Sequence, residues 1–244
     1  MDFKIFKNFP ELHYGISEKK DGFMNVKPMG SPEEDLVAGE NGQRFYEKNG
    51  IDSGKVFTPY LVHGNRVAIV SKNNLRERLR ADCFVTSVPG IVLTVTVADC
   101  FPLYFYDPVR RAVGLAHAGW RGIVKNIVEN AVQKFKEAFG SNPNDILLAI
   151  GPGIQKCHFT VKSDVIDSFR DFPHFQKYER FVTGGADLYN VDLESIIKEQ
   201  AKSVGVNKIE SLSECTYCLS DRYFSYRRDK SDPLETMLAY LSLG

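Results

Sequence analysis

Two consecutive apolar segments near the middle of the chain restrict its fold more than any other feature. PLYFYD (102–107) and AVGLAHAG (112–119) are both typical of β-strands, and only PVRR lies between them. So short a connection, beginning at the Asp107–Pro108 end, predicts an antiparallel hairpin. Because antiparallel partners place the start of one strand beside the end of the next, Cys100 and His117 should meet at one edge of the sheet.

Strand and helix patterns continue on both sides of this hairpin. Residues 58–70 and 81–100 are β-branched and alternating, with a turn at Pro89 and Gly90. Between Ile123 and Phe139 apolar residues recur at helical spacing, and Gly140 is a natural stop. We expect further helices near 163–172, capped by Ser163 or Asp164, and near 191–205, strands near 145–150 and 208–216, and mostly loops around short elements before residue 56. The sequence therefore predicts an α+β fold, with a mixed β-sheet core, helices packed on its outer faces, and a single domain over residues 1–244.

Composition narrows the classes of function. The chain has 244 residues, 43% of them hydrophobic, and 31 Lys and Arg residues balance 31 Asp and Glu residues. Without excess positive charge, nucleic acid is not an expected partner. The apolar runs are far shorter than the roughly 20 residues of a membrane span, and the N-terminal segment lacks a signal peptide's apolar stretch, so no membrane partner is expected. Five irregularly spaced cysteines favour reduced thiols, and we expect a cytoplasmic protein, either a monomer or a homo-oligomer.

Cys100 and His117 admit three interpretations: inert core residues, a cysteine nucleophile with its base, or two ligands of a metal ion. A catalytic zinc site needs about three protein ligands, and His63 in LVHGN is the best candidate for the third. His63 lies at the end of a short strand-like run, and Gly64 permits a tight turn that would leave this imidazole at a rim. The residues by themselves leave all three interpretations open.

Five motifs that occur in order resemble one protein family. They are VHG from Val62, Thr96–Cys100 with Pro102, AHAGWRG (Ala116–Gly122), IGPGI from Ile150, and CTYC with YFSYRRD from Cys215 onward. Together they resemble the laccase-domain proteins, long named multicopper polyphenol oxidases and now associated with purine nucleoside phosphorylase activity. The resemblance runs from Asn25 to Asp229. It departs from the family where FTV (159–161) replaces YEV, and where no Gly-Arg pair follows SYRRD.

The resemblance implies a metal site and an activity. It implies His63, Cys100 and His117 as the ligands of one zinc ion per chain. The implied reactions are phosphorolysis of adenosine, inosine, guanosine and methylthioadenosine, and deamination of adenosine, so the partners are purine nucleosides and phosphate. Copper is the second choice of ion, but five histidines cannot supply the several copper centres of a polyphenol oxidase. Two different functions stay open: a metal-free Cys–His hydrolase, in which His63 would have no use, and a cell-wall precursor editing factor.

Further residues are candidates for catalysis and for substrate binding. Asp99, next to Cys100, is the nearest carboxylate in sequence for a proton shuttle, and a hydrogen-bonding role is at least as well supported. Phosphate needs cations, and four arginines are candidates: Arg121 at a helix start, Arg66, Arg227 and Arg228. Five aromatic residues could stack on a base: Phe101, Trp120, Tyr223, Phe224 and Tyr226.

Cys215 and Cys218 form one CxxC pair. A structural zinc held by four thiolates would need a second such pair, which the sequence lacks. We therefore interpret CTYC as part of a structural loop, and we expect Cys83 and Cys157 to be buried.

Overall fold

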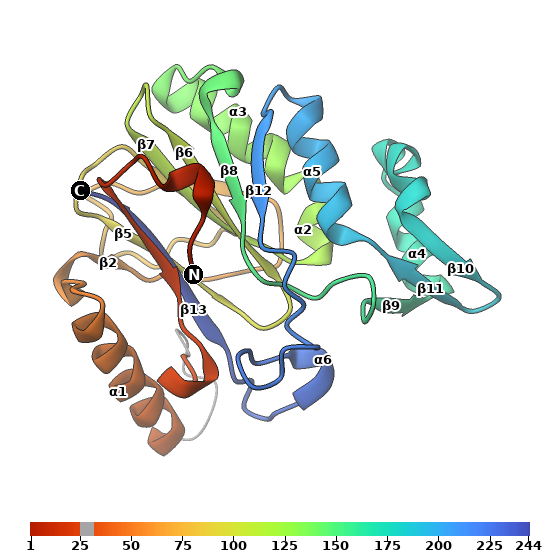
Figure 1. Ribbon diagram of the computed structural model, residues 1–244, viewed down its shortest axis with the longest axis horizontal. Coiled ribbons are helices and arrows are strands. Elements are labelled where there is room, and N and C mark those ends of the chain that lie inside the picture. The colour runs from red at the N-terminus through yellow and green to blue at the C-terminus, as the bar shows by residue number, and fades with distance from the viewer. Residues whose placement is uncertain (25–31) are drawn as a thin grey trace.

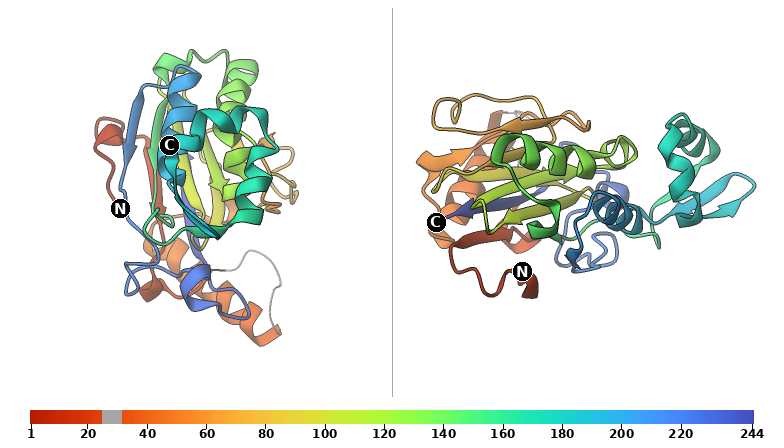
Figure 2. Two further views of the ribbon diagram at one scale, coloured as in Figure 1. Left: turned by 90° about the vertical axis from the view of Figure 1, so that its right-hand side faces the viewer. Right: turned by 90° about the horizontal axis from the view of Figure 1, so that it is seen from above.

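Two β-sheets packed face to face form the centre of the fold (Figures 1 and 2). The computed structural model describes residues 1–24 and 32–244, so Asn25, where the family resemblance begins, lies outside the described residues. The six-stranded sheet contains, in spatial order, β12 (Lys208–Ser211), β8 (Leu147–Ile150), β6 (Phe101–Asp107), β7 (Ala112–Ala118), β4 (Cys83–Thr86) and β3 (Val67–Ile69). The four-stranded sheet contains β1 (Leu12–Ile16), β13 (Met237–Leu243), β5 (Val92–Val97) and β2 (Val56–Phe57).

Helices cover the outer faces of this sandwich. The helices α3 (Ile127–Phe139) and α5 (Leu193–Ser203) pack on the six-stranded sheet, and α1 (Pro32–Lys48) packs on the four-stranded sheet through Phe45, whose ring lies edge-on to Tyr240. The predicted α+β class with a mixed sheet and outer helices is confirmed, because β12 runs parallel to β8 whereas β6 runs antiparallel to both β7 and β8.

Shorter elements complete the chain. A small lobe at one end of the molecule holds α4 (Ser163–Arg170) and a three-stranded sheet of β10 (Val182–Gly185), β11 (Leu188–Val191) and β9 (Thr160–Lys162), as Figures 1 and 2 show. The other short helices are α2 (Trp120–Val124), α6 (Tyr226–Asp229) and 3₁₀ turns at Lys4–Phe6, Lys19–Asp21, Ser53–Lys55, Pro143–Asp145 and Pro173–Phe181. Among the described residues, no helix has the length and apolar character needed to cross a membrane.

The predicted hairpin is confirmed in type and in register. Strands β6 and β7 pair antiparallel, with Pro102 opposite His117 and Asp107 opposite Ala112. Every residue of both strands is buried, because the six-stranded sheet is covered on one face by α3 and on the other by the second sheet. Cys100 directly precedes β6 and His117 is the second-last residue of β7, so both lie at the same edge of the sheet.

Two local predictions are wrong. The single helix expected from Ile123 is two helices, because Asn126 takes a left-handed conformation (φ 60°) between α2 and α3; Gly140 does end α3, as predicted. The turn predicted at Pro89 and Gly90 is confirmed, and it connects β4 to β5, which belong to different sheets. The N-cap residue of α4 is Lys162, not Ser163 or Asp164, and it makes no side-chain cap.

The largest error is α1, where we expected a loop. Pro32 at the first helical position and the acidic residues after it are helix-start signals. Gly39 and Gly42 obscured the helical pattern, since glycine is typical of loops. A Cβ at either glycine would meet nothing within 4 Å, so both positions face open space and tolerate the absence of a side chain.

Candidate functional site

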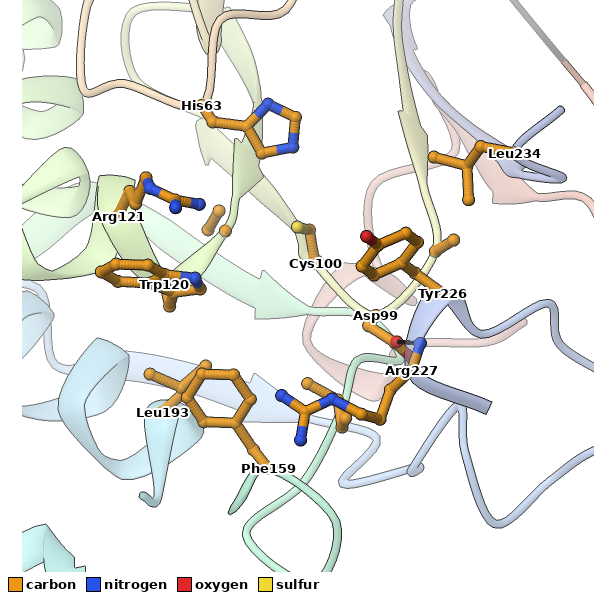
Figure 3. A pocket seen from close by; sticks show the side chains of 14 residues that line it. His63, Asp99, Cys100, Trp120, Arg121, Phe159, Leu193, Tyr226, Arg227 and Leu234 are labelled. Carbon is orange, nitrogen blue, oxygen red and sulfur yellow. Dashed lines mark hydrogen bonds between the residues drawn. The ribbon is translucent and has the colours of Figure 1, made fainter. Parts of the chain in front are cut away.

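Three side chains converge at the end of the hairpin: His63, Cys100 and His117. Their ligand atoms all lie within 4.8 Å of one another. The rings of His63 and His117 meet edge to face, with centroids 4.8 Å apart and planes at 88°. His63 comes from a loop, whereas we expected the end of a strand, and it is exposed. Figure 3 shows His63 and Cys100 facing one pocket.

Cys100 lies where the chain passes from one sheet to the other. Strand β5 ends at Val97 in the four-stranded sheet, and β6 begins at Phe101 in the six-stranded sheet. Asp99 makes the turn between them with φ 84°, a left-handed conformation that few non-glycine residues other than Asn and Asp adopt. This sharp turn places the thiol of Cys100 at the mouth of the sandwich instead of inside it.

Asp82, a residue that the sequence patterns did not reveal, positions both histidines. Its buried carboxylate accepts hydrogen bonds from the backbone N–H groups of His63 (2.9 Å) and Gly64 (2.7 Å). The same carboxylate lies 3.0 Å from Nδ1 of His117, which fixes the ring and directs Nε2 away from Asp82. Carboxylates often hold metal-ligating histidines in this way. The left-handed conformation of His63 (φ 55°) is thus stabilised by Asp82.

The charges in the cluster shift the pKa values of its members. Burial alone would raise the pKa of Cys100, but the charges and hydrogen bonds of His117 and His63 outweigh it and lower the pKa to about 6. Burial alone would lower the pKa of His117, yet the Cys100 thiolate and Asp82 raise it to about 10. A thiolate is therefore favoured at neutral pH, and the thiolate is the form that binds metals and attacks electrophiles.

The cluster has the donors and the space that a metal ion needs. Two imidazoles and one thiolate form a ligand set of catalytic zinc sites, which keep a fourth position open. Gly119 leaves room between the three side chains, because a Cβ there would lie 2.9 Å from Sγ of Cys100, 3.6 Å from Cδ2 of His63 and 3.9 Å from Cε1 of His117. The residues therefore fit a three-ligand metal site.

A pocket of about 400 Å³ opens over this cluster. Its volume lies in the range of about 300–1,000 Å³ that is usual for small-molecule sites. Trp120, Phe159, Leu193 and Tyr226 form apolar and aromatic walls, and Tyr226 is 62% exposed although it is a large aromatic residue. Of the five aromatic candidates for base stacking, Trp120 and Tyr226 thus line the pocket, whereas the other three are buried in the core: Phe101, Tyr223 and Phe224.

Two of the four candidate arginines face the pocket. Arg121 stacks over the ring of Trp120, with 4.2 Å between its Cζ and the ring centroid. Arg227 donates from Nη1 to the carbonyl of Thr160 (2.6 Å), and the rest of its guanidinium group points into the pocket (Figure 3). Helix α2, which Arg121 was expected to open, has only 5 residues and starts one residue earlier, so its dipole adds little to an anion site.

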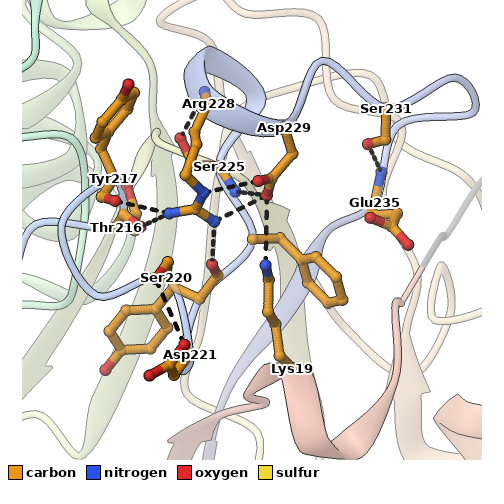
Figure 4. A network of polar contacts seen from close by, with 12 residues as sticks. Lys19, Thr216, Tyr217, Ser220, Asp221, Ser225, Arg228, Asp229, Ser231 and Glu235 are labelled. Carbon is orange, nitrogen blue, oxygen red and sulfur yellow. Dashed lines mark hydrogen bonds and ion pairs between the residues drawn. The ribbon is translucent and has the colours of Figure 1, made fainter.

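The other two arginines are not at the pocket, which corrects their placement. Arg66 lines a separate surface cleft with Asn130 and Lys134. Arg228 is fully engaged in a network shown in Figure 4, where it donates to the carbonyls of Thr216, Tyr217 and Tyr223 and pairs with Asp229. Sequence adjacency to Arg227 was misleading, because consecutive residues in α6 point in different directions.

Asp99 lines the pocket, but both of its carboxylate oxygens have partners. Oδ1 accepts from the hydroxyl of Thr216 (2.6 Å), and Oδ2 accepts from the backbone N–H of Arg227 (2.7 Å; Figure 3). Asp99 thereby joins the turn before β6 to the segment that carries Tyr226 and Arg227. This geometry supports a positioning role more directly than a proton shuttle.

Comparisons with known proteins agree with the fold and with the motifs. The chain matches the family described as "Multi-copper polyphenol oxidoreductase laccase" over residues 9–242. It is 32% identical over 192 residues to "Purine nucleoside phosphorylase YfiH" of Escherichia coli, covering 79% of this chain and 76% of that protein. It is 34% identical over 178 residues to "Purine nucleoside phosphorylase YlmD" of Bacillus subtilis; that match covers 69% of this chain but only 64%, less than two thirds, of the relative. The solved structure of Bacillus licheniformis hypothetical protein YfiH superposes with a TM-score of 0.86 at 29% identity, covering 98% of this chain and 95% of that one.

Proposed function

Because the chain belongs to the family of multi-copper polyphenol oxidoreductase laccases, we propose that it is a zinc-dependent purine nucleoside phosphorylase of the kind for which its relatives are named. The proposed substrates are adenosine, inosine, guanosine and methylthioadenosine with phosphate, and deamination of adenosine is proposed at the same site. One observation carries the proposal: a Cys–His–His cluster lies beneath a pocket that also presents two guanidinium groups and three aromatic side chains.

Zinc is the proposed ion at His63, Cys100 and His117. Mixed nitrogen and thiolate donors suit zinc, and five histidines in the whole chain are too few for the several centres of a copper oxidase. A zinc ion held there supplies a Lewis acid that polarises an oxygen atom of substrate or water. We place the enzyme in the cytoplasm, where its five free cysteines would stay reduced.

The pocket residues divide between the two substrates. In phosphorolysis the bond from the ribose to the purine nitrogen breaks, a bond from the same carbon to a phosphate oxygen forms, and the purine takes up a proton. Arg121 and Arg227 supply positive charge for phosphate, and planar guanidinium groups bind its oxygens in pairs. Trp120 and Tyr226 present faces on which a purine can stack. Asp99 keeps Arg227 in place through its backbone N–H.

The direct test uses protein purified without added metal. We expect it to contain zinc and to release hypoxanthine from inosine only when phosphate is supplied. Release without phosphate would identify a hydrolase, and no release from any of the four nucleosides would refute the proposal. Formation of inosine from adenosine in the same preparation tests the deaminase activity separately.

The proposed role of Arg121 predicts a selective kinetic defect. Arg121→Lys keeps the charge but loses the paired contact to phosphate, so the phosphate KM should rise roughly tenfold while the nucleoside KM changes less. Arg66→Lys is the matched control, since Arg66 lines a different cleft, and it should leave both KM values unchanged. If Arg121→Lys leaves both KM values at wild type and lowers only the melting temperature, Arg121 is structural.

The open space beside Gly119 predicts a steric effect. In Gly119→Ala the backbone conformation (φ −76°) suits alanine, but the new methyl group would lie 2.9 Å from Sγ of Cys100. We expect zinc occupancy and activity to fall by roughly tenfold or more, because displacing a ligand by about 1 Å disrupts the coordination geometry. Gly39→Ala, at a helical position with nothing within 4 Å, is the control and should keep full zinc content. Full occupancy in Gly119→Ala would contradict this prediction.

A metal-free cysteine hydrolase is the second candidate, and one observation favours it. The pKa of Cys100, lowered to about 6 by His117 and His63, is that of an activated thiol. His63 argues against it, since a nucleophile and base need no third donor. The two functions predict different results for a variant that lacks the Cys100 thiol. The zinc enzyme would lose its pocket ion, whereas the metal content of the hydrolase would not change.

A further inference from the structure

A second cluster of metal-ligand side chains lies outside the pocket. It consists of Cys157, His158, Cys215 and Cys218, and its ligand atoms all lie within 4.8 Å of one another. The first two residues come from the loop after β8, and the other two from the loop after β12. These loops run side by side in Figure 1 and are joined by a parallel bridge between Gly153 and Cys215. Cys157 is exposed, which corrects the expectation that it is buried.

The spacing of the four atoms is close to that of a tetrahedron around one ion. With zinc–sulfur bonds of about 2.3 Å and zinc–nitrogen bonds of about 2.05 Å, a regular tetrahedron places two sulfurs about 3.8 Å apart and a sulfur and a nitrogen about 3.6 Å apart. Here Sγ of Cys157 lies 3.7 Å from Sγ of Cys215 and 3.8 Å from Sγ of Cys218. Nδ1 of His158 lies 3.2, 3.9 and 3.3 Å from the sulfurs of Cys157, Cys215 and Cys218.

Neighbouring groups orient these donors. The backbone N–H of Gln155 points at Sγ of Cys215 (3.5 Å), which stabilises a thiolate there. The ring of Tyr217 stacks on that of His158, with centroids 3.9 Å apart and planes at 14°. The three sulfurs and the imidazole nitrogen lie within reach of one ion, and a divalent ion would bind the sulfurs as thiolates.

We propose that Cys157, His158, Cys215 and Cys218 bind a second, structural zinc ion. Four protein donors leave no open position, in contrast to the three at the pocket, so this ion would hold structure and not substrate. Thiolate-rich sets select zinc over magnesium, calcium or manganese. The CxxC pair of Cys215 and Cys218 thus has two partner ligands, Cys157 and His158. These partners are adjacent in sequence and one is a histidine, so the sequence contains no second CxxC pattern.

The proposed ion would join two walls of the pocket. Ile154 and Phe159, which line the pocket, flank Cys157 and His158 in one loop. Thr216, next to Cys215 in the other loop, donates to Asp99, and the chain continues from there to Tyr226 and Arg227. Loss of the second ion should therefore raise substrate KM values through displaced walls while the cluster around Cys100 keeps its own ion.

Zinc content tests the proposal without reference to any activity. Protein purified under reducing conditions without added metal should contain about two zinc ions per chain by elemental analysis, where the pocket cluster alone would give about one. Cys157→Ser and Cys218→Ser should each lower the content to about one, and both side chains are exposed, so serine fits at either position. Lys156→Ala, an exposed neighbour in the same loop, should keep two.

A second measurement isolates the site. Zinc-stripped Cys100→Ala protein, in which the pocket cluster is incomplete, should gain several degrees in melting temperature when zinc is added, and the double variant with Cys157→Ser should gain none. A wild-type content of one zinc that Cys100→Ala removes would overturn the proposal. So would iron in place of the second zinc, or two thiols lost to a disulfide with no second metal.

Discussion

Cys100→Ala should remove about one zinc ion per chain and lower kcat/KM for inosine phosphorolysis by about 10³-fold or more. Cys100 is the only thiolate donor of the pocket cluster among the described residues, and two histidines are too few to hold a catalytic zinc ion. A bound ion contributes several kcal/mol to transition-state stabilisation, and each 1.36 kcal/mol is worth a factor of ten in rate. The measurements are elemental analysis and steady-state kinetics on the same preparation.

Cys83→Ala is the matched control, since Cys83 also follows an Ala-Asp pair. Its thiol is fully buried, and burial raises its pKa far above the ordinary value, so it stays protonated and inert. This variant should keep its zinc and lose only about 1 kcal/mol of stability. Wild-type zinc in Cys100→Ala together with lost activity would favour the cysteine hydrolase instead.

Asp82→Asn should weaken zinc binding at the pocket cluster by about 10–100-fold and destabilise the fold by about 3 kcal/mol. The amide keeps the shape of the side chain but brings an NH₂ group against backbone N–H donors of His63 and Gly64. It also removes the negative charge that helps to raise the pKa of His117. Competition with a chromogenic chelator measures the affinity, and thermal unfolding of the metal-free protein measures the stability.

Asp107→Asn is the control that separates the effect of Asp82 on zinc binding from its effect on the stability of the fold. Asp107 is equally buried and lies at the turn of the β6–β7 hairpin, the end away from His117, where its Oδ1 accepts from the backbone N–H groups of Val109 and Arg110. It should lower the melting temperature without changing zinc affinity. If the two variants lose stability alike and both bind zinc normally, Asp82 has only a structural role.

Local patterns in the sequence were enough to predict the hairpin and the meeting of Cys100 with His117. Both follow from strand alternation and a short connection, and the pairing of Pro102 with His117 confirms the reasoning. Asp82 could not be found in this way, because it acts on the backbone N–H groups of a loop about twenty residues earlier, and such contacts leave no spacing in the sequence. The only sequence signal of Asp82 is its position directly before β4, the strand that pairs with the strand carrying His117.

Other errors have the same origin in long-range contacts. Arg66 and Arg228 were grouped with Arg121 by residue type alone, and only the fold separates a guanidinium group that faces the pocket from one that donates to carbonyls. The four-residue cluster joins positions that lie 57–61 residues apart in the chain. Helix α1 was missed for the opposite reason, since two glycines in a local pattern outweighed correct start signals.

The two clusters have a further consequence for the chain as a polymer. With metal bound, coordination bonds close one loop of the chain between His63 and His117. They close a second loop, which spans 61 residues, between Cys157 and Cys218. These two loops follow one another along the chain and do not overlap, so each restricts the unfolded ensemble independently of the other. By the relation used for disulfides, closing a loop of 61 residues stabilises the folded state by about 4 kcal/mol. A chelator would thus destabilise this chain as a reductant destabilises a disulfide-bonded secreted protein, because it would open both loops at once.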